Sequence, residues 1–439
     1  MIALTHVNYY DFKTYAKDQY IIFDDKIIEV GPMANFVNQD YEVIEGMDQL
    51  VMPSLINGHH HIYSTFARGL LLPFDPKNFQ EILDQLWWKL DGSQDLNNVY
   101  YSGIVSGIEG VKNGITTIID HHASGLDIKG SLETLKKAIC DEIGLRGIFC
   151  FESSDRFDIE ACIEENLSFA KKYKTTKTVG LFGLHAAMSL SEESLAKISK
   201  VIEDIPIHIH VAESHMDEDL SMERYGERII HRLDRHQLLR ENSLLVHCLY
   251  IDEDEAHLIG RRKCTVALNV TSNMNNGVGL PDHELFEKEG IPVIIGNDGI
   301  GSGITPEWLN LNFAMHHRDL TPVRFGLDQV LKMVNQTYVY ASSILGCKLG
   351  RIQAGYEADL LMIPYIPPTP MNKDNAFGHV CFGLANSFKP SYVWCGGKKV
   401  LDYYEVEDNL MNTYREASKS AEKLWDRVQK TSNYEGGIV

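Results

Sequence analysis

Eight short apolar runs alternate with stretches of helical character between residues 50 and 298, and this alternation limits the fold most strongly. The runs are rich in Val and Ile: LVMPSLING, GITTIID, LRGIFCF, TVGLFGL, IPIHIHVA, SLLVHCL, TVALNV and IPVIIGND. Each is nearly continuous in hydrophobicity, as strands buried on both faces must be. Eight such βα repeats predict an α/β protein with a TIM-type (β/α)8 barrel.

An open, doubly wound parallel sheet also alternates strands and helices, and it is the competing interpretation. It is disfavoured because no GxGxxG motif opens a helix after the first run. One helix between runs is well marked. Ser189 and Glu192 predict its capping box, and the apolar residues 195, 198, 202 and 205 follow along one face.

The two ends of the chain carry the remaining β signals. YIIFDDKIIEVG predicts a hairpin that turns at Asp24-Asp25, and SYVWCGGKKVLD predicts one that turns at Gly396-Gly397. Neither hairpin could bury a face alone, so we expect both to join in one small composite β-sandwich. The expected domains are residues 1–54 and 355–405 for this composite domain, 55–354 for the barrel and 406–439 for a C-terminal helical extension.

Composition restricts the partners of the chain. A formal net charge of −20 would repel a phosphate backbone, so we expect no nucleic-acid partner. No apolar run approaches the ~18 residues that span a bilayer, and the N-terminus lacks the pattern of a secretory signal. The eight cysteines form no CxxC pair and are typical of reduced thiols. We therefore expect a cytoplasmic protein that acts on a small molecule, with no membrane partner.

Seven of the eight runs end in histidine or acidic residues, where a TIM barrel carries its chemistry. These residues are His59 to His61, Asp120, His121, His122, Glu152, His185, His210, Glu213, His247 and Asp298. A single buried histidine is most often a core residue that bonds to a carbonyl, but the convergence of so many favours a metal site.

Alternation along a strand assigns the triplet HHH. Successive side chains point to opposite faces, so His59 and His61 share the face toward the barrel axis and His60 points toward the surrounding helices or a loop. By the same argument His210 is the ligand nearer the strand end, and His208 lies deeper in the barrel. Glu213 can reach the site only if the strand ends near residue 212.

Three neutral imidazoles and one carboxylate suit zinc, with ferrous iron as the alternative. Such a metal lowers the pKa of its water toward ~7, which predicts hydrolysis.

These motifs resemble the amidohydrolase superfamily, in particular its mononuclear deaminase and chlorohydrolase branch. The resemblance rests on MPSLINGHHHIYSTFARG, HVAES, VHCLYID, TSNMNNGVG, GNDGIGSG and GRIQAGYEADLLMI, and so covers nearly the whole chain. LWWKLD, TTIIDHHASG and CFESSDR are further similar to the SsnA-type aminohydrolases.

The resemblance implies roles for individual residues. It implies His59, His61, His210 and Asp298 as metal ligands. It also implies that Glu213 is the catalytic acid/base, that His247 and Asp298 hold the water, and that His185 contacts substrate. One divalent metal is implied, because TVGLFGLHA lacks the lysine that marks two-metal members. A homodimer is implied by the family alone.

The predicted reaction is hydrolysis of a C–N bond in a small heterocyclic or amidine-like substrate, with release of ammonia. Release of chloride and hydrolysis of a cyclic amide at the same site are the alternatives. The alternative that the chain is a catalytically inactive barrel kept as a scaffold is disfavoured, because none of the expected metal-ligand residues is missing from the sequence. Residues 62–95 are the expected lid, and the candidate substrate contacts besides His185 are Arg68, Trp88, His122 and Asn273.

Overall fold

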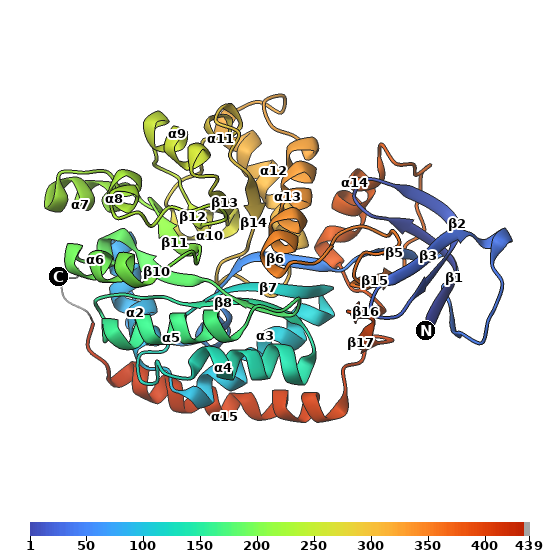
Figure 1. Ribbon diagram of the computed structural model, residues 1–439, viewed down its shortest axis with the longest axis horizontal. Helices are drawn as coiled ribbons and strands as arrows, with labels where there is room; N and C mark the ends of the chain where they lie inside the picture. Colours follow the sequence, from blue (N-terminus) through green and yellow to red (C-terminus); the bar gives the residue numbers. More distant parts are fainter. Residues whose placement is uncertain (434–439) are drawn as a thin grey trace.

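Each of the eight apolar runs contributes at least one strand to a closed barrel, as their continuous hydrophobicity predicts (Figure 1). The computed structural model describes residues 1–433. The barrel strands are β6 (Leu55–His60), β7 (Ile115–His122), β8 (Arg146–Phe151), β9 (Thr178–Gly180), β10 (Phe182–Ala186), β11 (Ile207–Val211), β12 (Leu244–His247), β13 (Thr265–Leu268) and β14 (Val293–Ile295). The run TVGLFGL breaks at Leu181 and supplies both β9 and β10, so eight runs give nine strands.

The barrel consists of two parallel sheets, β6-β7-β8-β9 and β10-β11-β12-β13-β14. An isolated bridge between Ser153 and Leu184 joins them at one side, and a bridge between His60 and Asp298 joins them at the other. At the second seam the Asp298 backbone N–H donates to the His59 carbonyl at 3.1 Å. This closure confirms the barrel and excludes the doubly wound sheet.

Helices surround the barrel between its strands (Figure 1). The main ones are α3 (Leu96–Lys112), α4 (Ser131–Lys136), α5 (Ile159–Lys172), α6 (Glu192–Val201), α7 (His215–Tyr225), α8 (Ile229–Arg235), α9 (Glu253–Arg261), α10 (Val270–Asn276), α11 (His283–Lys288), α12 (Thr305–Asp319) and α13 (Leu327–Leu345). The capping box expected at Ser189 is wrong. Ser191 caps α6 instead and accepts from the Ser194 backbone N–H, while Ser189 lies in a 3-10 turn before the helix.

The two ends of the chain meet in one mixed sheet beside the barrel, which confirms the composite domain. Its strands are β1 (Ile2–Tyr10), β2 (Tyr15–Phe23), β3 (Ile27–Pro32), β4 (Glu42–Glu45), β5 (Leu50–Pro53), β15 (Leu360–Ile363), β16 (Tyr392–Cys395) and β17 (Lys398–Asp402). Both expected hairpins are present, as β2–β3 and β16–β17. The short helix α14 (Ala376–His379) lies between β15 and β16 in the chain.

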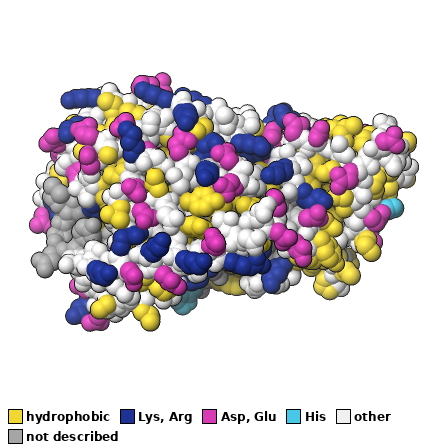
Figure 2. Space-filling model, turned by 90° about the horizontal axis from the view of Figure 1, so that it is seen from below, with side chains coloured by type: hydrophobic (Ala, Val, Ile, Leu, Met, Phe, Trp, Pro, Cys, Tyr) yellow, Lys and Arg dark blue, Asp and Glu magenta, His cyan; other side chains and the backbone are white. Residues whose placement is uncertain are grey.

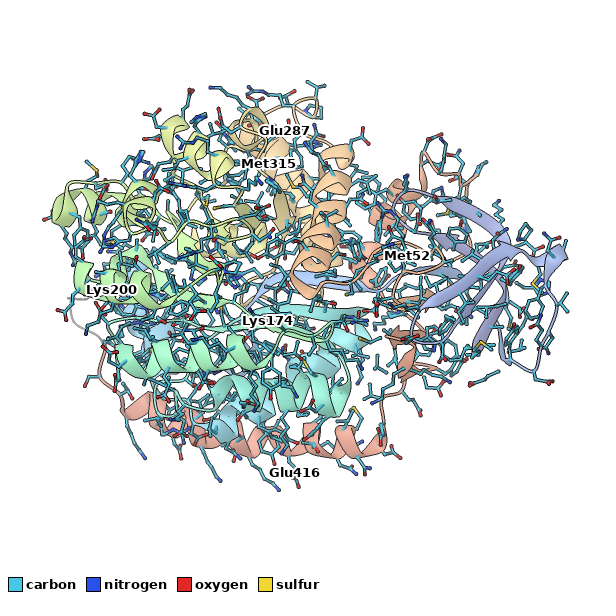
Figure 3. The ribbon with its side chains drawn as sticks, in the orientation of Figure 1. Met52, Lys174, Lys200, Glu287, Met315 and Glu416 are labelled. Carbon is cyan, nitrogen blue, oxygen red and sulfur yellow. The ribbon has the colours of Figure 1, made fainter. Side chains whose placement is uncertain are left out.

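Strand β5 connects the two hydrophobic cores. The run LVMPSLING divides at Ser54, so its first half pairs with the composite sheet and its second half begins the barrel. Within β5, Val51 packs in the core of the composite sheet, whereas Met52 packs in the large barrel core. Figure 3 shows Met52 where the barrel and the composite sheet meet. The exact domain boundaries stay a prediction.

The C-terminal helix α15 (Asp408–Lys430) lies along the outside of the barrel against α3 (Figure 1). It falls within the stretch 406–439, for which a helical extension was predicted and of which residues 434–439 lie outside the described residues. Figure 2 shows this side of the molecule, where acidic and basic side chains are interspersed. Among residues 1–433, no helix combines the length and the hydrophobicity that a membrane span needs.

The segment between β6 and α3 is held between the barrel and α15. It contains the 3-10 turn Ile62–Ala67, α1 (Phe79–Ile82), a π-helical turn at Leu83–Trp87 and α2 (Trp88–Gly92). Leu424 of α15 is fully buried in a cluster with Tyr63 and Phe66 of this segment. Trp425 Nε1 also donates to the Phe66 carbonyl at 2.7 Å. The helix thus fixes the position of the segment that covers the barrel mouth.

Candidate active site and metal centre

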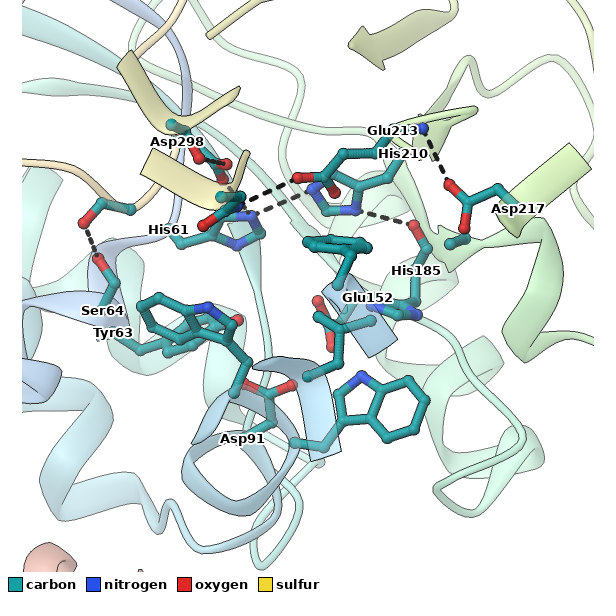
Figure 4. Close-up of a pocket in the computed structure, with 18 of the residues that line it drawn as sticks. His61, Tyr63, Ser64, Asp91, Glu152, His185, His210, Glu213, Asp217 and Asp298 are labelled. Carbon is teal, nitrogen blue, oxygen red and sulfur yellow. Dashed lines mark hydrogen bonds and ion pairs between the residues drawn. The ribbon is translucent and has the colours of Figure 1, made fainter. Parts of the chain in front are cut away.

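Four side chains that could hold a metal ion converge where β6, β11 and β14 end: His59, His61, His210 and Asp298. One ligand atom from each lies within 4.8 Å of those from the others. Asp298 Oδ1 lies 3.5 Å from His59 Nε2 and 3.0 Å from His61 Nε2. Figure 4 shows His61, His210 and Asp298 facing one another. The structure therefore brings together the four ligands that the sequence predicts.

Backbone carbonyls set the tautomers of two of these histidines. His61 Nδ1 lies 2.7 Å from the His121 carbonyl, and His210 Nδ1 lies 2.9 Å from the His185 carbonyl. A carbonyl can only accept, so each Nδ1 carries a proton and donates it. In the neutral rings the two Nε2 lone pairs then face each other across 3.1 Å. Such an arrangement needs a positive charge between the nitrogens, as a metal would supply.

The donor set fits a divalent cation in two further ways. Burial lowers the pKa values of His59 and His210 far below their usual range, so both imidazoles are neutral and able to bind metal. Among the described residues His59 Nε2 is also buried without a hydrogen-bond partner. In the metal-free protein, burial opposes the charging of His61, but the hydrogen bond to Asp298 and the charges of Asp298, Glu152 and Asp120 together outweigh it and raise the pKa of His61 to about 9. A proton and a metal therefore compete for this site.

His60 and His208 lie where strand alternation places them. His60 points away from the barrel axis, and its ring nitrogens contact Asn297 Oδ1 at 2.9 Å and Ser106 Oγ of α3 at 3.1 Å. His208 is fully buried, and its Nε2 lies 2.8 Å from His59 Nδ1. His208 therefore supports a predicted ligand from below.

Glu213 reaches the site because β11 ends at Val211 and the chain turns at Ala212, whose φ is +46°. Its Oε2 lies 3.5 Å from His247 Nε2, which in turn lies 3.9 Å from Asp298 Oδ2. Burial raises the pKa of Glu213 well above its usual range, and the charge of Asp298 adds to this effect. A carboxyl group with a raised pKa beside a metal site is suited to carry protons.

Helix α10 positions two of these groups from behind. Ser272 Oγ donates to Asp298 Oδ2 at 2.6 Å, and Asn273 Nδ2 donates to His247 Nδ1 at 2.8 Å. The accepting Nδ1 leaves the proton of His247 on Nε2, which faces Glu213. Asn273 was expected to contact substrate, but it is fully buried and does not line the pocket.

The other expected substrate contacts divide into two groups. His185 and Trp88 line the pocket. Arg68 does not line it, because its guanidinium makes two 2.9 Å hydrogen bonds with Glu109 and its side chain is 58% exposed. His122 does not line it either, since it is fully buried and bonds to the serine hydroxyl two residues on.

The pocket above the candidate metal ligands has an empty volume of about 740 Å³, its open mouth included. The segment at 62–95, predicted as a lid, supplies much of its wall, including Tyr63, Phe79, Trp87 and Trp88. Aromatic walls of this kind suit a flat ring.

A buried ionic network in the pocket wall was missed from the sequence. Arg156 lies between Asp91 and Glu152, with N···O distances of 3.0 Å and 2.6 Å. Glu152 was noted at a strand end, but Asp91 and Arg156 stand 65 residues apart and no spacing connects them. The sequence signal for this network was the presence of charged residues within the otherwise apolar stretch LWWKLD, because a buried charge needs a partner.

Comparisons with known proteins identify the family and support the fold. The 5′-deoxyadenosine deaminase of Methanocaldococcus jannaschii is 25% identical over 418 residues, which are 92% of this chain and 96% of that protein. Among solved structures, an adenosine deaminase from Xanthomonas campestris with bound zinc superimposes with a TM-score of 0.82 at 18% identity, covering 98% of this chain and 99% of that one. Atrazine chlorohydrolase from Arthrobacter aurescens, complexed with zinc, gives 0.78 at 18% identity, covering 97% and 100%. The model of the amidohydrolase family matches residues 50–400, and the chain therefore belongs to the amidohydrolase family.

Proposed function

We propose that the chain is a metal-dependent aminohydrolase that replaces an amino group on a small heterocyclic or amidine-like substrate by a carbonyl oxygen. The observation that carries this proposal is the convergence of the four metal-ligand side chains with Glu213 and His247 at one end of an aromatic-walled pocket. The deaminase activity named for the Methanocaldococcus jannaschii relative supports the same reaction class. Such an enzyme is a hydrolase of C–N bonds other than peptide bonds.

Zinc is the proposed metal, with ferrous iron as the alternative. His59, His61, His210 and Asp298 would hold one ion, and three nitrogens with one carboxylate oxygen suit either metal. The two structural neighbours described above contain zinc. When bound, the ion supplies the Lewis acidity that lowers the pKa of water. Elemental analysis of the purified protein checks this assignment.

The side chains around the ligands move and hold the protons. Glu213 takes a proton from the attacking water and delivers it to the ring nitrogen beside the reacting carbon. Its raised pKa lets it hold that proton between the two steps. The new hydroxyl on the reacting carbon then gives up its proton as the carbonyl forms, and that proton passes to the amino group, which leaves as ammonia. His247, protonated on Nε2, orients the water toward the substrate, and Asn276 Nδ2 steadies Glu213 Oε1 at 3.4 Å.

Glu213→Gln tests the assignment. The amide keeps the shape of the side chain but cannot carry the proton, so we expect turnover to fall by ~10²–10⁴-fold. Metal content should stay stoichiometric because Glu213 is not among the four ligands. Glu223→Gln, at an exposed glutamate of α7, is the matched control and should be fully active. Near-normal ammonia release by the Glu213 variant contradicts the role.

Two alternative reactions, release of chloride and hydrolysis of a cyclic amide, would use the same residues. The structural neighbour from Arthrobacter aurescens is a chlorohydrolase. A screen that measures both ammonia and chloride across aminopurines, pterins, aminopyrimidines and chlorotriazines separates deamination from dechlorination. Ring opening of cyclic amides is followed in the same samples by mass spectrometry. A protein that holds metal but converts none of these compounds supports the inactive scaffold instead.

We also propose that the protein is an SsnA-type member of its family, forms a homodimer and acts in the cytoplasm. These three proposals rest on the family resemblance and on the composition of the chain. Sedimentation equilibrium of the purified protein tests the dimer, and a monomer at micromolar concentration contradicts it.

A further inference from the structure

Away from the proposed metal ligands, the pocket wall carries negative charge and no spare positive charge. Five carboxylate side chains line it: Asp91, Glu152, Glu213, Asp217 and Asp298. Among the described residues that line it, none is a lysine or an arginine. Asp298 belongs to the metal ligands, Glu213 to the proton path, and Asp217 Oδ2 accepts the Glu213 backbone N–H at 2.9 Å. Asp91 and Glu152 are left to face the substrate.

The nearest guanidinium is already occupied. Arg156 lies behind the wall, 1% exposed, and its two terminal nitrogens bond to Asp91 and Glu152. Its Nε donates to Ser154 Oγ at 3.1 Å, and its Cζ lies 5.0 Å from the Trp88 ring centre. With every side of Arg156 engaged, it cannot turn to meet an anion in the pocket.

One carboxylate oxygen of this network, Asp91 Oδ1, has room for a further hydrogen-bond donor. Asp91 is 2% exposed, and its Oδ1 is buried without a hydrogen-bond partner of good geometry among the described residues, while an interaction with the Tyr63 hydroxyl lowers the pKa of the carboxyl. Burial and the charge of Glu152 raise the pKa of Asp91 to about 7, so the network is either neutral or carries one negative charge. In neither state does it offer a net positive charge. A buried carboxylate oxygen of this kind is satisfied by a donor on a ligand.

Asp91 lies at the other end of the pocket from the reacting groups. Figure 4 shows it on the opposite side of the pocket from Asp298 and Glu213, with Glu152 between the two ends. A substrate whose reacting carbon lies beside the metal ligands must therefore extend its remaining part toward Asp91 and Glu152.

We propose that this remaining part of the substrate is uncharged or cationic and presents at least one hydrogen-bond donor to Asp91, and that substrates with an anionic group there are excluded. The substrate class is thus a neutral or cationic heterocycle bearing amino or hydroxyl groups. The orientation of the substrate rests on the proposed function, whereas the charge preference is a property of the wall itself.

Calorimetric binding to the zinc-loaded Glu213→Gln variant tests the proposal without turnover. The probes are pairs that differ in one anionic group: adenosine with adenosine 5′-monophosphate, and pterin with pterin-6-carboxylate. We expect the neutral member of at least one pair to bind at least ~10-fold more tightly than its anionic partner. Equal or tighter binding of the anionic members, or no binding by either neutral member, overturns it. If a neutral member binds but wild-type enzyme releases no ammonia from it, the proposed function fails and the charge preference stands.

Asp91→Asn in the same background identifies the residue responsible. It keeps the shape of the side chain and removes its charge, so the preference for the neutral probe should fall at least ~5-fold. Glu193→Gln, at an exposed position of α6, is the matched control and should leave the preference unchanged. An unchanged preference in the Asp91 variant overturns its role. Should that variant not fold, the comparison of paired probes still decides the charge preference.

Discussion

Asn273→Ala is expected to slow turnover while the metal stays bound. Asn273 Nδ2 and His247 Nδ1 are 2.8 Å apart, and both side chains are fully buried. The substitution leaves Nδ1 buried without its donor, at a cost of ~1–3 kcal/mol. If His247 must hold its orientation in the transition state, this cost lowers kcat by ~5- to 150-fold, since 1.36 kcal/mol corresponds to a factor of ten.

Steady-state ammonia release and metal analysis are the assays for this variant. Met274→Ala provides the control, because Met274 lies on the same helix but is exposed. An unchanged kcat with a raised KM would refute the reasoning, since it is the result expected if Asn273 contacted substrate directly. An unchanged kcat and KM would show that the contact does not position His247.

Three further predictions concern the ligands and the C-terminal helix. His60→Ala should retain stoichiometric metal and His61→Ala should lose it, because only the latter side chain joins the ligand group; equal loss in both contradicts the strand assignment. Metal affinity should fall as pH falls below about 9, because metal must displace the proton that Asp298 stabilises on His61. Calorimetry in two buffers should then show proton release at pH 7.5, and no release contradicts the shift. Leu424→Ala should lower the free energy of unfolding by ~2–5 kcal/mol and raise KM without loss of metal, as measured by denaturation and kinetics. An unchanged KM would show that α15 stabilises the fold without positioning the pocket wall.

Local pattern predicted the strands well but could not assign every residue to a sheet. The continuous hydrophobicity of each barrel run follows from burial on both faces, and that requirement is visible in sequence. LVMPSLING has the same appearance throughout, yet β5 and β6 belong to different sheets. Which sheet a run joins depends on its neighbours in space, which local pattern does not contain. The helix cap was predicted at Ser189 but lies at Ser191. Both serines precede the same apolar helix, and local pattern does not decide between them.

The positions of those site residues that lie at or just after the end of a strand could be predicted from the sequence. The placement of His59 and His61 on one face follows from alternation alone, and the turn at Ala212 that brings in Glu213 was required by the same geometry. Arg68 was misjudged because its partner, Glu109, stands 41 residues away on α3. The network of Asp91 and Arg156 was missed for the same reason.

The seam between β6 and β14 places constraints on how the enzyme matures. His59 lies on the first barrel strand, His61 directly after it, and Asp298 follows the last strand, so the proposed ligand group and the closing bridge of the barrel occupy one location. A nascent chain has three of the four ligands once residue 210 has emerged from the ribosome, but it completes the set only after residue 298. With the proposed ligands, stable metal loading would therefore follow synthesis of the whole barrel, and a bound ion would link the first strand to the last and oppose opening of the barrel at this seam.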